Sequence, residues 1–268
     1  MSFSITGKTA IVTGAANGIG LAIARHFADK GANVMFADMD ETRLEEELGK
    51  QVEEGNIRYF AGDLREKLTI ANLLSATLDA FDRVDILVNA CRQVCKSDPL
   101  NADDDAVEIL LKQNLLTSLR LSQLVAKRMK HQAEEDGTSE GSIGTIINLS
   151  SIAARRTHPD LMAYSISSAA LDQMTRSLAV ALSKDKIRVN GVAFGSVMSA
   201  SLQSTLKDTP DYRNTIIAST PLERIASASE VAEAVQFLAS PAADFMTGQI
   251  LTVDGGRTLL DPVAAAAH

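Results

Sequence analysis

Aromatic residues and long apolar runs are scarce in this sequence. It has no tryptophan, and aromatic residues make up 4% of its 268 residues, so a core built from it must consist mainly of Ala, Val, Ile and Leu. No stretch reaches the length of about 18 apolar residues that a membrane-spanning helix needs. The opening MSFSITGKTAIVTG has no basic region followed by an apolar stretch and a cleavage site. We therefore expect neither a membrane span nor a signal peptide, and a cytoplasmic protein.

Cysteine is almost absent, and basic residues are outnumbered by acidic ones. The two cysteines, Cys91 and Cys95, have no His or further Cys nearby at metal-ligand spacing, so we predict no metal site and no redox pair. The sequence has 26 Lys and Arg residues and 34 Asp and Glu residues, which gives a formal net charge of -8. Because nucleic-acid recognition needs a basic surface that displaces counterions, this balance argues against a nucleic-acid partner.

The sequence does contain a regular alternation of short apolar runs and longer segments of helical periodicity. The apolar runs predict strands at 9–13, 33–38, 57–63, 84–90, 144–150, 187–194 and 248–256. The other segments predict helices at 18–31, 41–55, 65–81, about 103–130, 163–184 and 228–240. Strands that are apolar almost throughout indicate a parallel sheet covered by helices on both faces. We predict an α/β fold, a Rossmann-type doubly wound parallel sheet of about seven strands with three α/β/α layers, in a single domain over residues 1–268.

Three segments break this alternation. Residues 132–143 are acidic and rich in Gly and Ser, which predicts a solvated loop. Residues 195–220 are longer than the usual strand-to-helix connection, and such long connections often form lids or binding loops. We therefore expect a substrate loop there. The low-complexity tail, 261–268, is expected to be frayed or packed on a neighbouring subunit.

The stretch TGAANGIG, residues 13–20, lies between the first predicted strand and the first predicted helix. At this point backbone N–H groups and the positive end of the helix dipole can hold a pyrophosphate. Since glycine has no Cβ, Gly14 would permit a tight turn, Gly18 would let a cofactor approach the backbone, and Gly20 would let helix and strand pack closely. The spacing is G-x-x-x-G-x-G, and the glycines alone are also compatible with a turn that binds nothing.

An acidic residue at the end of the second predicted strand favours the binding interpretation. Asp38 lies 18 residues beyond Gly20, where a carboxylate can accept hydrogen bonds from the adenosine ribose hydroxyls. The same carboxylate would repel a 2′-phosphate, and Asp40 would add to the repulsion. Neither Asn17 nor Met39 offers the basic side chain that a phosphate requires. The cofactor predicted is NAD rather than NADP.

With these residues in place, the chain resembles the short-chain dehydrogenase/reductase family over essentially its whole length. The motifs that carry the resemblance, in order, are TGAANGIG, Asp63 in AGDL, Asn89 in ILVNA, Asn114 in KQNLLTS, NLSS at 148–151, Tyr164, RVNGVAFG at 188–195 and VDGG at 253–256. The resemblance implies an oxidoreductase that transfers a hydride between NAD(H) and a secondary alcohol or ketone. The cofactor-binding residues that it implies are Gly14, Asn17, Gly18, Ile19, Gly20, Asp38, Asp63, Leu64, Asn89, Tyr164, Gly195 and Val197.

The resemblance also implies catalytic roles. The Tyr164 hydroxyl would exchange a proton with the substrate oxygen, and Ser151, 13 residues earlier, would hold that oxygen. Asn114 would position a water of the proton relay. The family further implies a homo-oligomer, a tetramer or dimer, built through the long helix and the Tyr164 helix.

Three positions depart from the family's pattern. The family has a lysine four residues after its catalytic tyrosine, where its charge lowers the pKa of the tyrosine and its amine binds the nicotinamide ribose. Here that residue is Ser168, which can offer the ribose a hydrogen bond but no charge. Arg92 stands where a glycine is usual, and Phe194 where a proline commonly precedes Gly195.

The loss of the lysine leaves three explanations open. Arg92 partly replaces it, the enzyme works more slowly without it, or the domain binds NAD for a structural or sensing role and no longer catalyses. The substrate pocket is expected near residues 92–97, 152–161 and 196–217. Arg155 or Arg156 in its wall would suit an acidic group on the substrate.

Overall fold

The computed structural model describes residues 2–49, 55–137 and 141–261, and seven of its segments form one parallel sheet. The strands are β1 (Thr9–Thr13), β2 (Asn33–Asp38), β3 (Ile57–Ala61), β4 (Ile86–Asn89), β5 (Gly144–Ser151), β6 (Ile187–Phe194) and β7 (Ile250–Val253). Their order is β3-β2-β1-β4-β5-β6-β7, so the winding reverses between β1 and β4. In such sheets ligands bind beyond the carboxyl ends of the strands at the point of reversal. The predicted doubly wound fold is confirmed.

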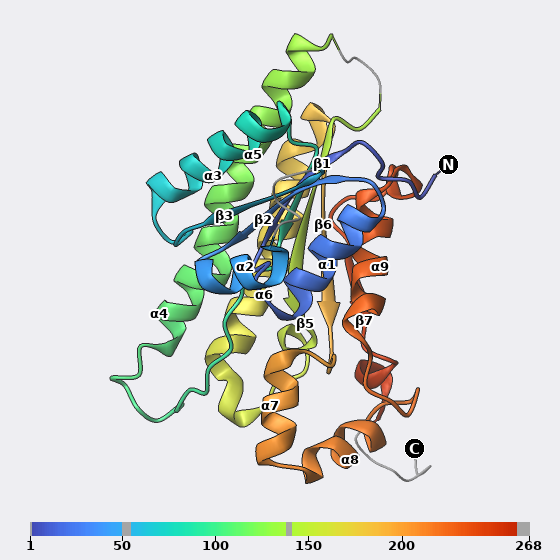
Figure 1. Ribbon diagram of the computed structural model, residues 1–268. Helices are drawn as coiled ribbons and strands as arrows, with labels where there is room; N and C mark the ends of the chain where they lie inside the picture. Colours follow the sequence, from blue (N-terminus) through green and yellow to red (C-terminus); the bar gives the residue numbers. More distant parts are fainter. Residues whose placement is uncertain (1, 50–54, 138–140, 262–268) are drawn as a thin grey trace.

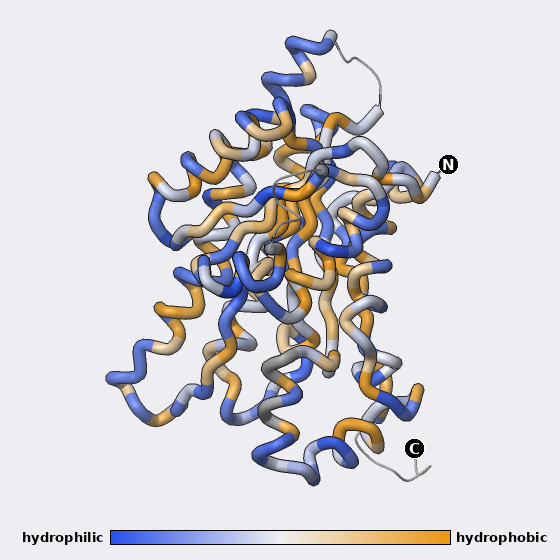
Figure 2. Tube along the Cα trace, in the orientation of Figure 1, coloured by the Kyte–Doolittle hydropathy of each residue, from blue (hydrophilic) through white to orange (hydrophobic). Residues whose placement is uncertain are grey.

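Helices cover both faces of the sheet (Figure 1). They are α1 (Gly18–Asp29), α2 (Glu41–Leu48), α3 (Lys67–Phe81), α4 (Ala106–Leu110), α5 (Thr117–Glu135), α6 (Met162–Leu182), α7 (Ala200–Asp208), α8 (Asp211–Ala218) and α9 (Ala228–Ala239). One core cluster joins the sheet to α1, α2 and α9, and a second joins it to α3, α5 and α6. Figure 2 shows hydrophobic residues concentrated along the central strands and hydrophilic ones on the outer helices.

The core is aliphatic, as the shortage of aromatic residues predicts. Every residue of β1, β5 and β6 is buried. Along β5, Ile147 and Leu149 belong to the α1 and α9 cluster, whereas Ile146 belongs to the α5 and α6 cluster. Successive strand residues point to opposite faces, so a strand covered on both sides is mainly apolar, and a buried polar residue such as Asn148 is hydrogen-bonded within the core.

Several predicted boundaries differ from those observed. The helix expected at about 103–130 consists of α4, a π-helical turn (Leu111–Leu116) and α5, which continues to Glu135 because Gln, Ala and Glu favour helix. The start of the predicted loop at 132–143 was therefore wrong. The expected substrate loop at 195–220 carries α7 and α8, with Pro210 just before α8. Parts of the predictions for 41–55, 132–143 and 261–268 lie outside the described residues.

α7 and α8 stand beyond the carboxyl ends of the strands, at the edge of the sheet where this fold binds ligands (Figure 1). Within the described part of the chain, no helix is both long and apolar enough to cross a membrane.

Candidate active site

The glycine turn between β1 and α1 has a backbone that only glycine adopts easily. Gly14 has φ +66° and Gly18 has φ +56°, both in the left-handed region. A Cβ on Gly14 would lie 2.8 Å from Cys91 Cα, and one on Gly20 would lie 2.1 Å from the Gly14 carbonyl oxygen. Among the described residues outside its own helix and chain neighbours, the nearest atom to a Cβ on Gly18 would be Ser199 Cβ, at 3.9 Å. Gly14 and Gly20 thus shape the turn, while Gly18 leaves its outer side open.

Asp38 lies beside this turn because β2 is the neighbour of β1. Its Oδ2 accepts a hydrogen bond of 3.1 Å from the Ala16 backbone N–H, and its Oδ1 accepts bonds of 2.7 and 3.2 Å from the N–H groups of Met39 and Asp40. Three backbone donors therefore fix a carboxylate next to an open, glycine-lined helix start. This arrangement fits the ribose and pyrophosphate of a dinucleotide.

The remaining residues of the glycine turn are partly accessible. Asn17 is exposed at the N-cap of α1 without capping the helix by its side chain, and Ile19 is half-buried. Both lie where a bound dinucleotide would pass.

Asp63 and Leu64 follow β3. Arg65 donates from Nε to both Asp63 oxygens at 2.9 Å and from Nη2 to Oδ2 at 2.6 Å, which lowers the pKa of the Asp63 carboxyl. Leu64 is buried. Asp63 is thus ionised and already paired at the place where the family resemblance predicts an adenine contact.

Asn89 has a role within the core. Its Nδ2 donates to Ser122 Oγ at 3.0 Å and to Asn148 Oδ1 at 2.8 Å, and Asn148 in turn donates to Thr175 Oγ1 at 2.9 Å. This chain of bonds joins β4, β5, α5 and α6. The Asn89 side chain therefore ties the sheet to the helices.

Gly195 and Val197 form the turn after β6. The Gly195 N–H donates to the Val253 carbonyl at 3.1 Å, and Val197 is buried and bridged to Ala226. Arg257 Nη1 donates to Ser196 Oγ at 2.9 Å between them. The turn is therefore anchored from both sides at the carboxyl edge of the sheet.

Ser151 and Tyr164 come to the same end of the sheet. Ser151 ends β5, and its Oγ accepts a hydrogen bond of 3.1 Å from the Ala153 N–H, which starts a short 3-10 turn. Tyr164 lies in the first turn of α6, is only 5% exposed, and shares an apolar cluster with Ala153 and Leu110. The structure thus packs the turn that follows Ser151 against Tyr164.

Asn114 lies in the π-helical turn, a distortion that is frequent at functional sites. Its Oδ1 accepts from the Gln93 N–H at 2.8 Å, and its Nδ2 donates to the Gln93 carbonyl at 2.9 Å and to Ser167 Oγ at 3.3 Å. The amide therefore clamps the segment after β4 to α6. Nothing in the sequence pattern indicated Gln93 or Ser167 as its partners.

Position 168 and its surroundings carry the departures from the family's pattern. Ser168 is buried on α6, one turn after Tyr164. Arg92 points toward Tyr164, with Cζ 5.7 Å from the centre of the tyrosine ring and 4.1 Å from that of Phe194. Arg92 Nη1 also donates to the Ser150 carbonyl at 2.9 Å. A cation therefore lies beside the tyrosine.

Arg155 and Arg156 are exposed. Arg155 Nη1 donates to Thr252 Oγ1 at 3.1 Å, and Arg156 donates to the Thr258 carbonyl. Both arginines therefore hold the segment after β5 against the segment around β7.

Asp172, a buried carboxyl residue one turn beyond Ser168 on α6, was not predicted from the sequence as part of the site. Asp172 is 3% exposed, and among the described residues neither its Oδ1 nor the nearby Ser150 Oγ has a partner at hydrogen-bonding geometry. Burial raises the pKa of Asp172, and Ser150, Arg155 and Arg176 oppose the rise only in part. The ionised form is therefore less favourable in the folded protein than in the unfolded chain.

Asp172→Asn is expected to raise stability at neutral pH by about 1 kcal/mol. A carboxyl whose pKa is raised on folding costs nothing below its unfolded pKa and costs most above its folded pKa. The gain should therefore shrink as the pH falls through the raised folded pKa, and less than about half of it should remain at pH 4, close to the unfolded pKa of about 3.9. Urea unfolding of wild type and Asp172→Asn between pH 4 and 8 measures this, with exposed Asp79→Asn as the charge-matched control. A gain of equal size at both ends of the range would contradict the assignment.

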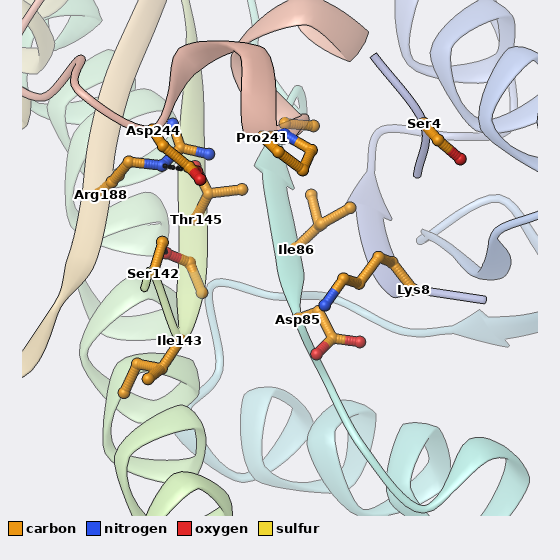
Figure 3. Close-up of a pocket in the computed structure, with 12 residues that line it drawn as sticks. Ser4, Lys8, Asp85, Ile86, Ser142, Ile143, Thr145, Arg188, Pro241 and Asp244 are labelled. Atoms are coloured by element: carbon orange, nitrogen blue, oxygen red, sulfur yellow. Dashed lines mark hydrogen bonds and ion pairs between the residues drawn. The ribbon is translucent and has the colours of Figure 1, made fainter. Parts of the chain in front are cut away.

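The structure also has a cavity at the opposite edge of the sheet (Figure 3). It measures about 100 Å³ and lies at the amino ends of β4, β5 and β6, between Asp85, Thr145 and Arg188. Arg188 Nε is 3.6 Å from Asp244 Oδ1, and Asp85 Oδ2 accepts from the Thr9 N–H at 2.9 Å. Because this cavity is remote from the glycine turn and from Tyr164, it is not the candidate active site.

Comparison with known proteins agrees with this geometry. Residues 14–258 match the sequence model of the family described as enoyl-(acyl carrier protein) reductase. The chain is 32% identical to 7alpha-hydroxysteroid dehydrogenase of Escherichia coli (strain K12) over 94% of each chain. It is 33% identical to L-fucose dehydrogenase of Mus musculus over 95% of this chain and 89% of that one. A solved structure of 7alpha-hydroxysteroid dehydrogenase with NADH and 7-oxo glycochenodeoxycholic acid superposes with TM-score 0.85, at 32% identity over 95% of this chain and 96% of the other.

The chain therefore belongs to the short-chain dehydrogenase/reductase family. It is an oxidoreductase that transfers a hydride between a nicotinamide dinucleotide and an alcohol or ketone substrate. The alternative, an NAD-binding protein with a structural or sensing role only, finds no support in these comparisons.

Proposed function

We propose that the protein interconverts a secondary alcohol and a ketone with NAD(H) in preference to NADP(H), with Tyr164 as the acid and base and Ser151 as the partner of the substrate oxygen. One observation carries this proposal: the carboxyl edge of the sheet brings the glycine turn, Asp38, Ser151 and Tyr164 together. When bound, NAD(H) supplies or accepts the hydride. The relatives' complex with NADH and a 7-oxo compound supports the same class of reaction.

Each residue has a defined task in this mechanism. In reduction, the Tyr164 hydroxyl gives its proton to the substrate carbonyl oxygen as the carbonyl carbon gains a hydride. The Ser151 hydroxyl donates a hydrogen bond to the same oxygen and stabilises its developing charge. Asn114 keeps the segment after β4 in place through Gln93 and supports the relay that reprotonates Tyr164. Ser168 is available to bind the nicotinamide ribose.

The proposal extends to assembly and location. The family resemblance supports a homo-oligomer, a tetramer or dimer, through α5 and α6, and Val180 on α6 exposes 77% of its surface. It also supports a cytoplasmic protein that acts on small molecules.

The cofactor preference has a direct test. Wild type is expected to use NAD+ at least about 100-fold better than NADP+ in kcat/KM, because Asp38 would face the 2′-phosphate with a like charge. Asp38→Asn should reduce this ratio by about 10-fold, mainly through KM for NADP+. The substrates to be tested are chosen from the names of the related dehydrogenases. They form a panel of a hydroxysteroid, an aldose and simple cyclic secondary alcohols.

The control is Asp82→Asn, which removes a carboxylate at the C-terminal end of α3, away from the glycine turn. Equal use of NADP+ by wild type would contradict the cofactor assignment. Absence of turnover with every member of the panel and either cofactor would contradict the proposed reaction.

A further inference from the structure

The guanidinium group of Arg92 is held by three different elements. Phe194, at the end of β6, stacks on it at 4.1 Å, and the Tyr164 ring on α6 lies at 5.7 Å, both within the range of a cation–π interaction. The third contact is the hydrogen bond from Nη1 to the Ser150 carbonyl at the end of β5. A long side chain with contacts on three sides has one defined position beside the tyrosine.

The three departures from the family's pattern therefore converge on one place. A glycine at position 92 would have no side chain to reach Tyr164, and a proline at position 194 would offer no aromatic face. In the sheet register Phe194 is the direct neighbour of Ser151. Arg92 thus lies beside Tyr164, Phe194 lies opposite Ser151, and Ser168 lies one turn after Tyr164 on α6.

The charge on Arg92 is not neutralised by a carboxylate. Its hydrogen-bond acceptor is a neutral carbonyl and its stacking partners are neutral rings, and no ion pair involves it within the described ranges 2–49, 55–137 and 141–261. An arginine stays protonated at any pH at which the protein is folded. Its positive charge therefore lies beside the Tyr164 ring with no carboxylate paired to it among the described residues.

We propose that Arg92 supplies the positive charge that a lysine at position 168 supplies in the family, and that Phe194 is the positioning residue that holds Arg92 against Tyr164. This rests on the proposed function, in which Tyr164 exchanges the proton. In reduction the tyrosine O–H bond breaks, the substrate O–H bond forms, and Tyr164 is left as a phenolate that takes a proton back from solvent. Arg92 stabilises that phenolate electrostatically.

The composition allows a test that needs no substrate. The chain has three tyrosines and no tryptophan, so ultraviolet difference absorbance of the Tyr59→Phe/Tyr212→Phe background reports phenolate formation at Tyr164 alone. In this background Arg92→Met should move the midpoint of the titration upward by about one pH unit. Arg92→Lys, which keeps the charge, should move it by less than half as much. Other titratable groups near Tyr164 include Cys95, packed on its apolar cluster, and Asp172 on α6, and both stay unchanged in all variants.

The role of Phe194 is tested by a double-mutant cycle. Phe194→Leu should raise the midpoint by about half a unit when Arg92 is present and should add nothing in the Arg92→Met background. Adding Ser168→Lys to Arg92→Met should return the midpoint to within about 0.3 unit of the starting value. The kcat of ketone reduction should follow the same order, with about a 10-fold loss in Arg92→Met and little change in the affinity for NAD.

An unchanged midpoint in Arg92→Met overturns the proposal for Arg92. A Phe194→Leu effect of the same size in both backgrounds overturns the positioning role. Thermal melting and calorimetric NAD binding show that each variant is folded, and Arg92→Gln replaces Arg92→Met if the latter does not fold. Failure of the proposed function would look different, because wild type would then show no turnover while the titration still responded to Arg92.

Discussion

Replacement of Tyr164 by phenylalanine is expected to lower kcat by about 1,000-fold, because it removes the proton that the substrate oxygen must receive. The ring would stay packed against Ala153, Ala163 and Leu110, and Arg92 would keep an aromatic face beside it. The melting temperature and the affinity for NAD should therefore stay close to those of wild type. Steady-state kinetics, calorimetric titration with NAD and thermal melting measure the three quantities on the same preparation.

The matched control is Tyr212→Phe on α8, where the tyrosine is half exposed. It removes the same atom from a residue outside the proposed proton transfer, so kcat should change less than about 2-fold. A Tyr164→Phe enzyme with wild-type kcat would rule out Tyr164 as the acid and base. A large fall in NAD affinity instead would indicate that the hydroxyl mainly binds the cofactor.

Most of the fold could be predicted because its signals are local in the sequence. The strands are short runs of Val, Ile, Leu and Ala, and the segments between them have helical periodicity, so the alternation itself predicts a parallel sheet. The glycine turn and Asp38 could be predicted for a similar reason. The glycine turn follows the end of β1, Asp38 ends β2, and the pairing of these two strands brings the turn and the carboxylate together.

The boundaries were less accurate where local preference and tertiary packing compete. The π-helical turn at Leu111–Leu116 interrupts the segment at about 103–130, whose periodicity predicts one continuous helix. Residues 195–220 have few apolar positions and an internal proline, which favoured a loop, yet α7 and α8 form at the edge of the sheet.

The contacts around Tyr164 could not be predicted, because they join residues that are far apart in the chain. Arg92 meets Phe194 across 102 positions, and its direction depends on how the segment after β4 is clamped by Asn114. Asp172 is likewise buried on α6 close to Ser150 of β5, 22 positions earlier in the chain. The sequence points to Ser168 as a departure from the family's pattern, whereas only the structure shows that the Arg92 guanidinium lies beside the Tyr164 ring.

The second large effect is expected on the free energy of unfolding when a glycine of the turn is replaced by alanine. Gly20 and Gly18 differ in the atoms that an added Cβ would contact. Gly20→Ala places a methyl group 2.1 Å from the Gly14 carbonyl oxygen, and neither the Cβ fixed to its Cα nor the backbone oxygen can rotate away. Relief requires α1 to move off β1, where Ile23, Ala24 and Phe27 are fully buried. We expect a loss of at least about 3 kcal/mol in the free energy of unfolding, at the upper end of overpacking costs.

Gly18→Ala should separate cofactor binding from stability. Among the described residues outside its own helix and chain neighbours, the nearest atom to its Cβ would be Ser199 Cβ at 3.9 Å, an ordinary van der Waals contact. The cost to the fold is therefore that of an alanine at φ +56°, about 1 kcal/mol. The methyl group would instead occupy the open side of the turn, where the pyrophosphate is proposed to approach, and NAD affinity should fall at least about 10-fold. Urea unfolding and calorimetric NAD titration of both variants give the comparison. If Gly18→Ala bound NAD as wild type does, the cofactor would have to lie elsewhere, whereas a Gly20→Ala protein of wild-type stability would mean that α1 is not held against the turn as this structure has it.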